Sequence, residues 1–517
     1  MMKDKEPLRM GVIDIGTHSV KLFIAEESEG DIKILESLKN VVALGRDTFF
    51  KERISQESIN RTVAILEKYN GILKEYAITN PRVIATTAVR EARNMDVFID
   101  TILRRTGLNI EVLTAGDVVY YIDAYLSHKL KGRYPIHEKN LLIAEPGAGS
   151  FDISLLAQGF TLMNVGLPLG TLRLKQLMSK LDGSIQENYE ALRENIENEF
   201  AYLKRSMPPL KVDDIILIDE SYSQYLGNIL TDKKFEDTFF QLSHSDTQQL
   251  LEKLRDKKPE DMTQDYKVPV ETAETFIEYA TILDSFVGLS ENKNIYILET
   301  SLSEAILANE ILDYETSQKY NKANQLISIA NALCRKYNVD LNHAHHVSKL
   351  ADTLFDSFKD LLGLKKTESL YLILAAYLHD IGMFIYNRTH HKHSEYIINT
   401  INFFRLSNDE IKTIACIARY HRKGSPSDAH LLYQSLPANR QILVQKLSAL
   451  LRIANSLDRS HKQKIKALEI KFNKAQDITF LVTTDANFTL ERCDFLEKKE
   501  ALEDISGNKI SLKIKPV

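Results

Sequence analysis

The stretch that decides the fold is Met10-Gly11-Val12-Ile13-Asp14-Ile15-Gly16-Thr17-His18-Ser19-Val20-Lys21-Leu22-Phe23-Ile24-Ala25. Two apolar runs flank a short polar segment that contains glycine, which predicts a β-hairpin with a polar tip. Small residues at such a tip let backbone N–H groups converge on phosphate oxygens, and a carboxylate beside them can hold Mg²⁺. The tip is therefore a candidate phosphate-binding turn; a glycine-containing hairpin without a ligand is the alternative.

A second strand-turn-strand unit occurs further along the chain. Residues 140–144 and 151–156 are predicted strands, and the turn between them is Glu145-Pro146-Gly147-Ala148-Gly149-Ser150. Helical and strand patterns alternate around both units, as in a mixed sheet flanked by helices. The repeat suggests a duplicated lobe with two phosphate-binding turns.

The rest of the chain differs in pattern. From about 315 to 462 only amphipathic helical periodicity is found, and strand alternation returns near the C-terminus. We therefore expect an α/β region followed by an all-α domain and a small α+β module. The expected boundaries are residues 1–135, 136–312, 313–465 and 466–517.

Composition limits the classes of function. The chain has 517 residues, 44% of them hydrophobic, and a net charge of −5, which argues against a protein-wide nucleic-acid surface and for several domains. No apolar run reaches the ~20 residues of a membrane helix, and the polar first residues lack the apolar core of a secretory signal. We expect a cytoplasmic protein without a membrane segment and without sequence-specific nucleic-acid binding.

Further motifs resemble a known family. Together the two turns resemble those of the actin-like ATPase (ribonuclease H-like) superfold. The stretch Ala85-Thr86-Thr87-Ala88-Val89-Arg90-Glu91-Ala92-Arg93-Asn94 is similar to the Ala-Thr-Ser-Ala-x-Arg-x-Ala-x-Asn signature of the exopolyphosphatase and guanosine pentaphosphate phosphatase family, Ppx/GppA. Leu167-Pro168-Leu169-Gly170-Thr171-Leu172-Arg173-Leu174 is similar to that family's next block. The resemblance extends over the helical region, where the family often carries an HD-like domain.

The resemblance implies removal of terminal phosphoryl groups from polyphosphate or guanosine pentaphosphate with Mg²⁺ or another divalent cation, by a homodimer that pairs through the helical domain. The implied phosphate-binding residues are Asp14, Gly16, Thr17, His18, Ser19, Arg90, Gly147, Ala148, Gly149 and Ser150. The implied metal ligands are Asp14, Glu145 and Asp152, and the catalytic candidates are Asp117 and Glu145.

Several positions depart from the family pattern. Val118 stands where the family has its water-activating glutamate, one residue after Asp117, and valine cannot accept a proton. Asp219 and Glu220 replace a Gly-Gly-Thr turn after a strand. Two hypotheses follow: an active phosphatase in which Asp117, Asp219 or Glu220 is the substitute base, and a catalytically impaired protein that binds phosphate, polyphosphate or nucleotide as a sensor or regulator.

The helical domain contains a second set of candidate residues. His343 and the pair His379-Asp380 resemble the His…His-Asp…Asp set of metal-dependent phosphohydrolases, with Asn455 at the distal aspartate position and Asp458 nearly one turn further on. Further histidines occur at 390, 391, 393 and 421. The alternatives are a metal site, a set of buried histidines that only pack helices, and a polyanion-binding groove of Arg388, His391, Lys392, Arg422 and Lys423.

Overall fold

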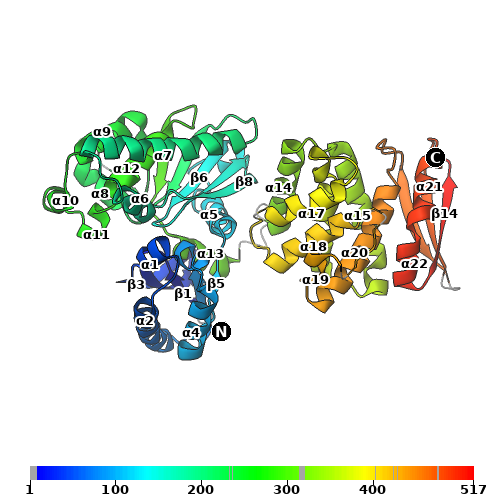
Figure 1. The fold of residues 1–517 in the computed structure, drawn as a ribbon, viewed down its shortest axis with the longest axis horizontal. Coiled ribbons are helices and arrows are strands. Elements are labelled where there is room, and N and C mark those ends of the chain that lie inside the picture. The colour runs from blue at the N-terminus through cyan, green and yellow to red at the C-terminus, as the bar shows by residue number, and fades with distance from the viewer. Residues whose placement is uncertain are drawn as a thin grey trace. The chain divides into compact units, whose positions relative to one another are not determined.

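The structure is a computed structural model that describes residues 8–517, except 232, 234, 236, 314–320, 402, 423, 428, 474–476 and the side chain of Ile185. The chain divides into two compact units, Met1–Lys322 and Ala323–Val517. In Figure 1 the first unit runs from blue to green and the second from yellow-green to red.

Lobe I of the first unit is built on a sheet with the strand order β3-β2-β1-β4-β5. Neighbouring strands are antiparallel from β3 to β1 and parallel from β1 to β5. The strands are β1 Arg9–Ile15, β2 Ser19–Ser28, β3 Asp31–Val41, β4 Arg82–Ala85 and β5 Glu111–Val112. The helices that follow them in the chain are α1 Leu44–Lys51, α2 Gln56–Glu75, α3 Thr87–Arg90, α4 Met95–Thr106 and α5 Ala115–Lys129.

Lobe II repeats this topology. Its sheet has the order β10-β11-β9-β6-β7-β8, in which β6, β7, β8, β9 and β11 take the places and directions of β1 to β5, and β10 is added at one edge. The strands are β6 Asn140–Pro146, β7 Phe151–Ala157, β8 Phe160–Leu167, β9 Asp214–Ile218, β10 Phe239–Ser243 and β11 Asn294–Leu298. The other elements are η1 Ile136–Glu138, α6 Thr171–Met178, α7 Ile185–Ser206, α8 Ser223–Ile229, α9 His244–Leu254, α10 Pro259–Tyr266, α11 Val270–Ala273, α12 Phe276–Val287 and α13 Leu302–Leu312.

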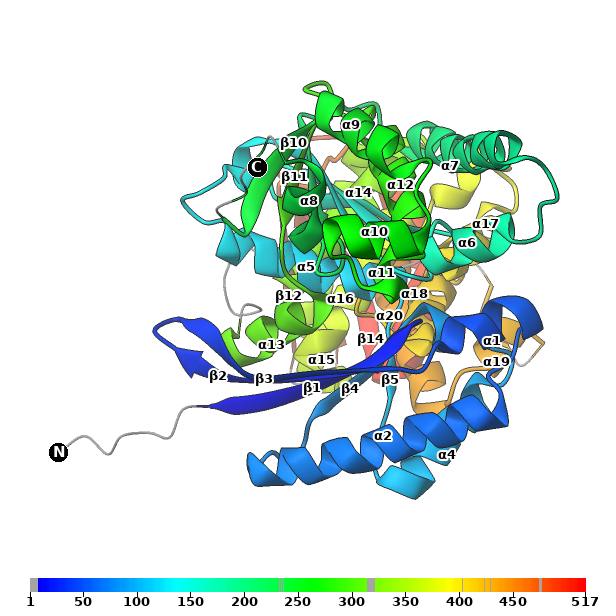
Figure 2. The same ribbon diagram turned by 90° about the vertical axis from the view of Figure 1, so that its left-hand side faces the viewer.

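Two helices are exchanged between the lobes. Helix α5 leaves lobe I and packs on β6, β7 and β8, whereas α13 leaves lobe II and packs on β1, β2 and β3. Figure 2 shows α13 on one face of the lobe I sheet and α2 and α4 side by side on the other. Since α5 and α13 also pack against each other, these two helices tie the lobes together and help to position the turns between them.

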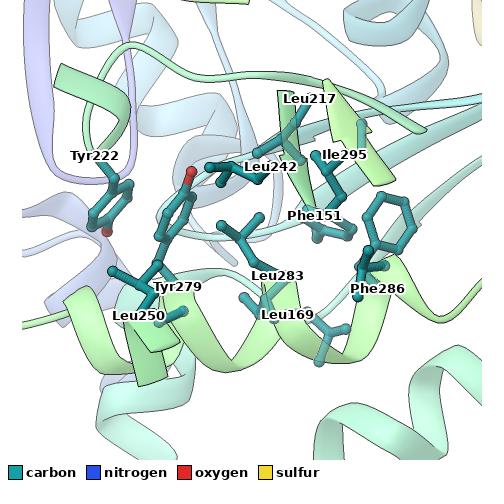
Figure 3. Close-up of a cluster of buried hydrophobic side chains, with 14 of the residues drawn as sticks. Phe151, Leu169, Leu217, Tyr222, Leu242, Leu250, Tyr279, Leu283, Phe286 and Ile295 are labelled. Atoms are coloured by element: carbon teal, nitrogen blue, oxygen red, sulfur yellow. The ribbon is translucent and has the colours of Figure 1, made fainter. Parts of the chain in front are cut away.

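Each lobe has its own apolar core. In lobe II, Tyr279, Leu283 and Phe286 project from α12 toward side chains of the sheet, among them Phe151 and Ile295 (Figure 3), and all five are fully buried. A second cluster surrounds Ile13 and Ile15 of β1 in lobe I. The hairpin turns therefore start from strands that are fixed in rigid cores.

The second unit begins with helices, as the periodicity predicts. They are α14 Lys322–Lys336, α15 Leu341–Leu362, η3 Lys366–Glu368, α16 Ser369–Leu378, η4 Ile381–Phe384, α17 His390–Thr400, α18 Asn408–Arg419, α19 Leu431–Gln434 and α20 Ala438–Ser456. A sheet of order β12-β13-β14 and two helices close the chain: β12 Ala467–Phe472, β13 Asp477–Thr483, α21 Thr489–Lys498, α22 Glu500–Ser506 and β14 Lys509–Lys515.

The predicted fold class is confirmed: duplicated actin-like lobes precede a helical domain and a small α+β module. The compact units divide between Lys322 and Ala323, and the four predicted domain ranges stay predictions. Among the described residues, no helix is both long and apolar enough to cross a membrane.

Candidate functional site

The two hairpin turns have the same local geometry. Gly16 N donates to Ser19 O at 2.9 Å in the first turn, and Gly147 N donates to Ser150 O at 2.9 Å in the second. In the strand register, Asp14 lies opposite Lys21 and Glu145 lies opposite Asp152. The internal repeat thus gives each lobe a carboxylate two residues before its turn, and lobe II adds a second carboxylate across the hairpin.

The turns meet where the lobes approach each other, and glycine makes this approach possible. A Cβ on Gly149 would lie 2.6 Å from Thr17 Oγ1 and 3.0 Å from Thr87 Cβ, both in lobe I. Behind the second turn, a Cβ on Gly170 would lie only 2.2 Å from the carbonyl carbon of Gly149. A side chain at Gly149 would force the second turn away from lobe I, and one at Gly170 would displace the second turn from the segment behind it.

A cavity of about 430 Å³ opens between the turns. Its walls contain both glycine turns, the segment after β9, and residues of α6 and of the segment before α13. The lining residues include Asp14, Gly16, Thr17, His18, Ser19, Lys21, Lys39, Arg46, Thr87, Val118, Glu145, Gly147, Ala148, Gly149, Ser150, Asp152, Asp219 and Glu220. The structure therefore brings together the residues of both predicted turns and all three predicted metal ligands.

Burial raises the pKa of all three carboxylates of the cavity. Burial raises the pKa of Glu145 to about 8, with further increases from the nearby Asp152 and Asp14. Burial also raises the pKa of Asp152 to about 6 and that of Asp14 above its ordinary value. Asp14 Oδ1 and Asp152 Oδ1 are buried with no hydrogen-bond partner among the described residues. A cluster of this kind binds protons or a cation.

Basic groups balance the acids at the lobe I side of the cavity. Lys21, Lys39 and Arg46 line it, and Lys21 pairs with Glu220 of lobe II. His18 also lines the cavity, where burial lowers its pKa and its Nε2 has no partner among the described residues. The cavity thus offers cations and hydroxyl groups beside a carboxylate cluster, as a phosphate chain with a divalent ion requires.

Arg90, predicted to bind phosphate, is not among the described residues that line the cavity. Its guanidinium donates to the carbonyl of Leu113 and, at 3.1 Å, to Thr87 Oγ1. Thr87 Oγ1 lies 2.8 Å from Ser150 Oγ, which donates to Asp152 Oδ2 at 3.3 Å. Arg90 therefore supports the carboxylate of Asp152 through two hydroxyl groups, and its charge counteracts the effect of burial on the pKa of Asp152.

Two of the proposed substitute bases accept backbone hydrogen bonds near the start of a helix. Asp117 Oδ2 accepts from Thr114 N at 2.9 Å and from Thr114 Oγ1 at 2.8 Å, a capping box at the start of α5, and Asp117 is absent from the described lining of the cavity. Asp219 accepts from the backbone N–H groups of residues 221, 222 and 223 and from Tyr279 Oη at 2.6 Å. These hydrogen bonds hold both carboxylates in structural roles, and Val118 itself lines the cavity.

In the second unit, the structure brings His343, His379 and Asp380 together but leaves out Asn455. His379 Nε2 lies 3.5 Å and His343 Nε2 3.9 Å from Asp380 Oδ2. Asp458, rather than Asn455, contacts this group, with Oδ2 2.9 Å from His343 Nδ1. Helix α20 ends at Ser456, so the chain turns after Asn455 and directs Asp458 inward.

Further histidines join Asp380 on its other side. His390 Nε2 and His421 Nε2 lie 3.2 and 3.8 Å from Asp380 Oδ1. Gly382 is the sequence signal for this arrangement, because a Cβ there would lie 2.1 Å from His390 O and would push α17 away. Burial lowers the pKa of His379 to about 4. Burial alone would raise the pKa of Asp380, but the surrounding histidines lower it well below its ordinary value.

The described residues of the predicted polyanion groove are exposed or half-buried. Arg388 and Lys392 are exposed, Arg422 donates to Arg388 O at 3.2 Å, and His391 is half-buried with a pKa that burial lowers to about 4. Lys423 lies outside the described residues.

Comparisons with known proteins agree with this architecture. The model of the Ppx/GppA phosphatase family matches residues 23–313, and that of Ppx/GppA phosphatase domain III matches residues 326–504. A guanosine-5'-triphosphate,3'-diphosphate pyrophosphatase of Vibrio atlanticus is 21% identical over 501 residues, covering 95% of this chain and 93% of the relative. The corresponding protein of Pseudoalteromonas atlantica is 24% identical over 415 residues, 78% of each chain.

Solved structures share the fold. The crystal structure of the Aquifex aeolicus Ppx/GppA family member is 21% identical, with a TM-score of 0.52 over 60% of this chain and 100% of that one. An exopolyphosphatase from Cytophaga hutchinsonii gives a TM-score of 0.52 and 21% identity over 59% of this chain and 98% of that one. With two glycine turns around one carboxylate-lined cavity and family matches over both units, the chain belongs to the Ppx/GppA phosphatase family.

Proposed function

We propose that the first unit hydrolyses the terminal phosphoryl group of a phosphoanhydride, polyphosphate or guanosine pentaphosphate, with a divalent cation. The observation that carries this proposal is the convergence of two matching glycine turns and three carboxylates, Asp14, Glu145 and Asp152, on one cavity. The names of similar proteins, an exopolyphosphatase and guanosine pentaphosphate phosphatases, support the two substrate classes.

The residues present fit Mg²⁺. Carboxylate oxygens are the ligands that Mg²⁺ prefers, and Asp14 Oδ1 and Asp152 Oδ1 are buried without partners among the described residues. Asp14, Glu145 and Asp152 would hold the ion. When bound, such an ion neutralises charge on the phosphate oxygens.

Backbone and side-chain groups of the protein would bind the phosphate and accept the proton of the attacking water. Backbone N–H groups of the two turns and the hydroxyls of Thr17 and Ser150 would bind the terminal phosphate, and Lys21 and Lys39 would attract the rest of the phosphate chain. A water oxygen forms a bond to phosphorus as the bond to the leaving phosphate oxygen breaks, and the proton of the water must go to a base.

If Asp14 and Glu145 hold the ion, Asp152 is the candidate proton acceptor. Its Oδ1 and the Cβ of Ala115, in the first turn of α5, lie 2.7 and 2.8 Å from the position that a Cβ on Gly166 would take. This turn of α5 leads directly to Val118, where the family has its glutamate. Burial raises the pKa of Asp152 to about 6, so a carboxylate left free of the ion would be ionised near neutral pH and able to accept a proton.

Phosphate release from polyphosphate and from guanosine pentaphosphate with Mg²⁺ tests the proposal. Asp14→Asn, Glu145→Gln and Asp152→Asn should each reduce release by roughly 10²-fold or more. Glu138→Gln removes an exposed carboxylate seven residues before Glu145 and should leave release unchanged. If the wild-type protein releases no more phosphate than the three variants, hydrolysis at this site is refuted.

Val118 supports a second candidate function, binding without turnover. It is 1% exposed and brings an apolar side chain to the cavity wall at the family's glutamate position. A sensor would bind polyphosphate or nucleotide with Mg²⁺ but release no phosphate, and Val118→Glu would then create or strongly increase phosphate release.

We also propose that the protein is a homodimer, by its resemblance to the family. Light scattering coupled to size-exclusion chromatography should give twice the chain mass of 59.1 kDa, and a single-chain mass would refute this.

A further inference from the structure

We propose that the second unit binds two transition-metal ions that share the carboxylate of Asp380, one with His343 and His379 and the other with His390 and His421. This centre is independent of the phosphatase function proposed for the first unit.

The two oxygens of Asp380 face different pairs of histidines. Oδ2 lies 3.5 Å from His379 Nε2 and 3.9 Å from His343 Nε2. Oδ1 lies 3.2 Å from His390 Nε2 and 3.8 Å from His421 Nε2. Ligands about 2.0–2.2 Å from one ion are separated from each other by roughly 3.0–3.5 Å, so each group is close to the spacing that an ion requires.

The hydrogen bonds on the far side of each ring decide where its lone pair points. His379, His390 and His421 direct Nδ1 at the carbonyl oxygens of Ala376, Asn387 and Ala418, at 2.7, 2.7 and 2.6 Å. His343 directs Nδ1 at Asp458 Oδ2. A carbonyl or carboxylate oxygen only accepts hydrogen bonds, so each Nδ1 carries the proton and each Nε2 presents a lone pair to Asp380.

The centre of the group therefore contains acceptors facing acceptors. His390 Nε2 and His421 Nε2 are 3.1 Å apart, and both also face a carboxylate oxygen. One proton could bridge that pair, but His343 Nε2 and His379 Nε2 would still be buried with no partner among the described residues. An ion in each half turns every one of these lone pairs into a ligand.

The donor set selects the class of metal. Imidazole nitrogen with carboxylate oxygen suits Mn²⁺, Fe²⁺, Co²⁺ or Zn²⁺, whereas Mg²⁺ prefers oxygen ligands alone. Each ion would have three protein ligands, which leaves coordination positions open for water, as in reactive rather than purely structural sites. The two units of the chain would thus bind different classes of metal.

The surrounding structure fixes both halves in place. Ser394 Oγ of α17 donates to His379 O at 2.6 Å and accepts from Gly382 N at 3.0 Å, so the segment that carries Asp380 is joined to the helix that carries His390. Asp458 accepts from Gln463 N at 2.8 Å as well as from His343. A buried carboxylate that holds a histidine through Nδ1 is the usual support of a metal ligand.

Metal content and electron paramagnetic resonance test this inference on the full-length protein. Chelator-treated protein is dialysed against Mn²⁺ with Mg²⁺ in large excess, which keeps Mn²⁺ out of the carboxylate cavity of the first unit. We expect two Mn²⁺ per chain and the spectrum of an exchange-coupled pair, because one carboxylate bridges the ions. His390→Ala should retain one uncoupled Mn²⁺, and Asp380→Ala should retain none.

Two variants serve as matched controls. His391→Ala changes the neighbour of His390 outside the group, and Glu145→Gln alters only the cavity of the first unit; both should retain two coupled ions. A wild-type content of one or none, or two ions without coupling, would overturn the inference even if the alanine variants failed to fold. Equal loss in His391→Ala and His390→Ala would overturn it as well.

Discussion

Glu145 and Asp152 face each other across one hairpin, and burial together with this pairing raises the pKa of Glu145. Two carboxylates this close cannot both ionise easily without a cation, so one of them holds a proton well above its usual pH range. Ionising both carboxylates therefore costs free energy, by an amount that depends on pH, and a bound divalent ion removes this cost.

Without a metal ion, the contribution of Glu145 to the free energy of unfolding should fall as the pH rises from about 4.5 to about 8. The carboxyl of unfolded glutamate loses its proton near pH 4.5, whereas that of folded Glu145 keeps it until about pH 8, so the folded state binds more protons throughout this window. One such proton gives a slope of ~1.4 kcal/mol per pH unit. Urea unfolding across this range should show a flatter slope for Glu145→Gln; equal slopes would contradict the burial of a titrating Glu145.

At the scale of single residues, the sequence predicted the residues of the turns better than the contacts made by the functional side chains. Asp14 and Gly16 could be recognised because a turn between two strands has a local signature. Arg90 lies in a matching signature and donates to Leu113 O, and the contact with His343 is made by Asp458, three residues after Asn455 and beyond the end of α20. Side-chain direction at the ends of helices depends on tertiary contacts.

Among the elements, helix caps explain why some carboxylates near the cavity are unavailable for chemistry. Asp117→Ala should lower the free energy of unfolding by about 0.5–2 kcal/mol, since it removes the capping box of α5, and should leave phosphate release per folded molecule unchanged. Denaturation and the release assay on the same preparation check this. Loss of release with unchanged stability would return Asp117 to the catalytic candidates.

Asp219 should also contribute to stability, through the hydrogen bonds that it accepts in the segment before α8. Asp219→Asn keeps the shape but offers an amide N–H where backbone N–H groups and Tyr279 Oη donate, so buried donors lose their acceptor. We expect a loss of about 1–3 kcal/mol in the free energy of unfolding, measured by urea denaturation. A variant as stable as the wild type would show that these hydrogen bonds are dispensable.

Substitution by alanine should have opposite effects on stability at a glycine that packs against a turn and at a glycine within a helix. Gly170→Ala places a Cβ 2.2 Å from the backbone of Gly149 and should destabilise the protein by about 1–3 kcal/mol. Gly71→Ala, within α2 and with nothing within 4 Å of the added Cβ, should stabilise it by about 0.5–1 kcal/mol. Thermal unfolding of both variants compares them directly; similar shifts would contradict the close packing of Gly170 against the second turn.

Across the whole first unit, duplication explains the site. The strands β6, β7, β8, β9 and β11 repeat β1 to β5, so two copies of one hairpin turn face a shared cavity. The sequence predicted this repeat from its two strand-turn-strand units, but not the added strand β10 or the exchange of α5 and α13 between lobes. Helix α5 is buried on almost every side, and such a pattern does not indicate which sheet a helix packs on.

Calorimetric titration of metal-free protein with polyphosphate, with and without Mg²⁺, tests whether the two turns form one metal-dependent phosphate site with the carboxylates Asp14, Glu145 and Asp152. We predict binding that requires Mg²⁺ in the wild type and in Glu138→Gln, and that is lost in Glu145→Gln. Binding of equal strength without Mg²⁺, or undiminished binding by Glu145→Gln, would contradict it.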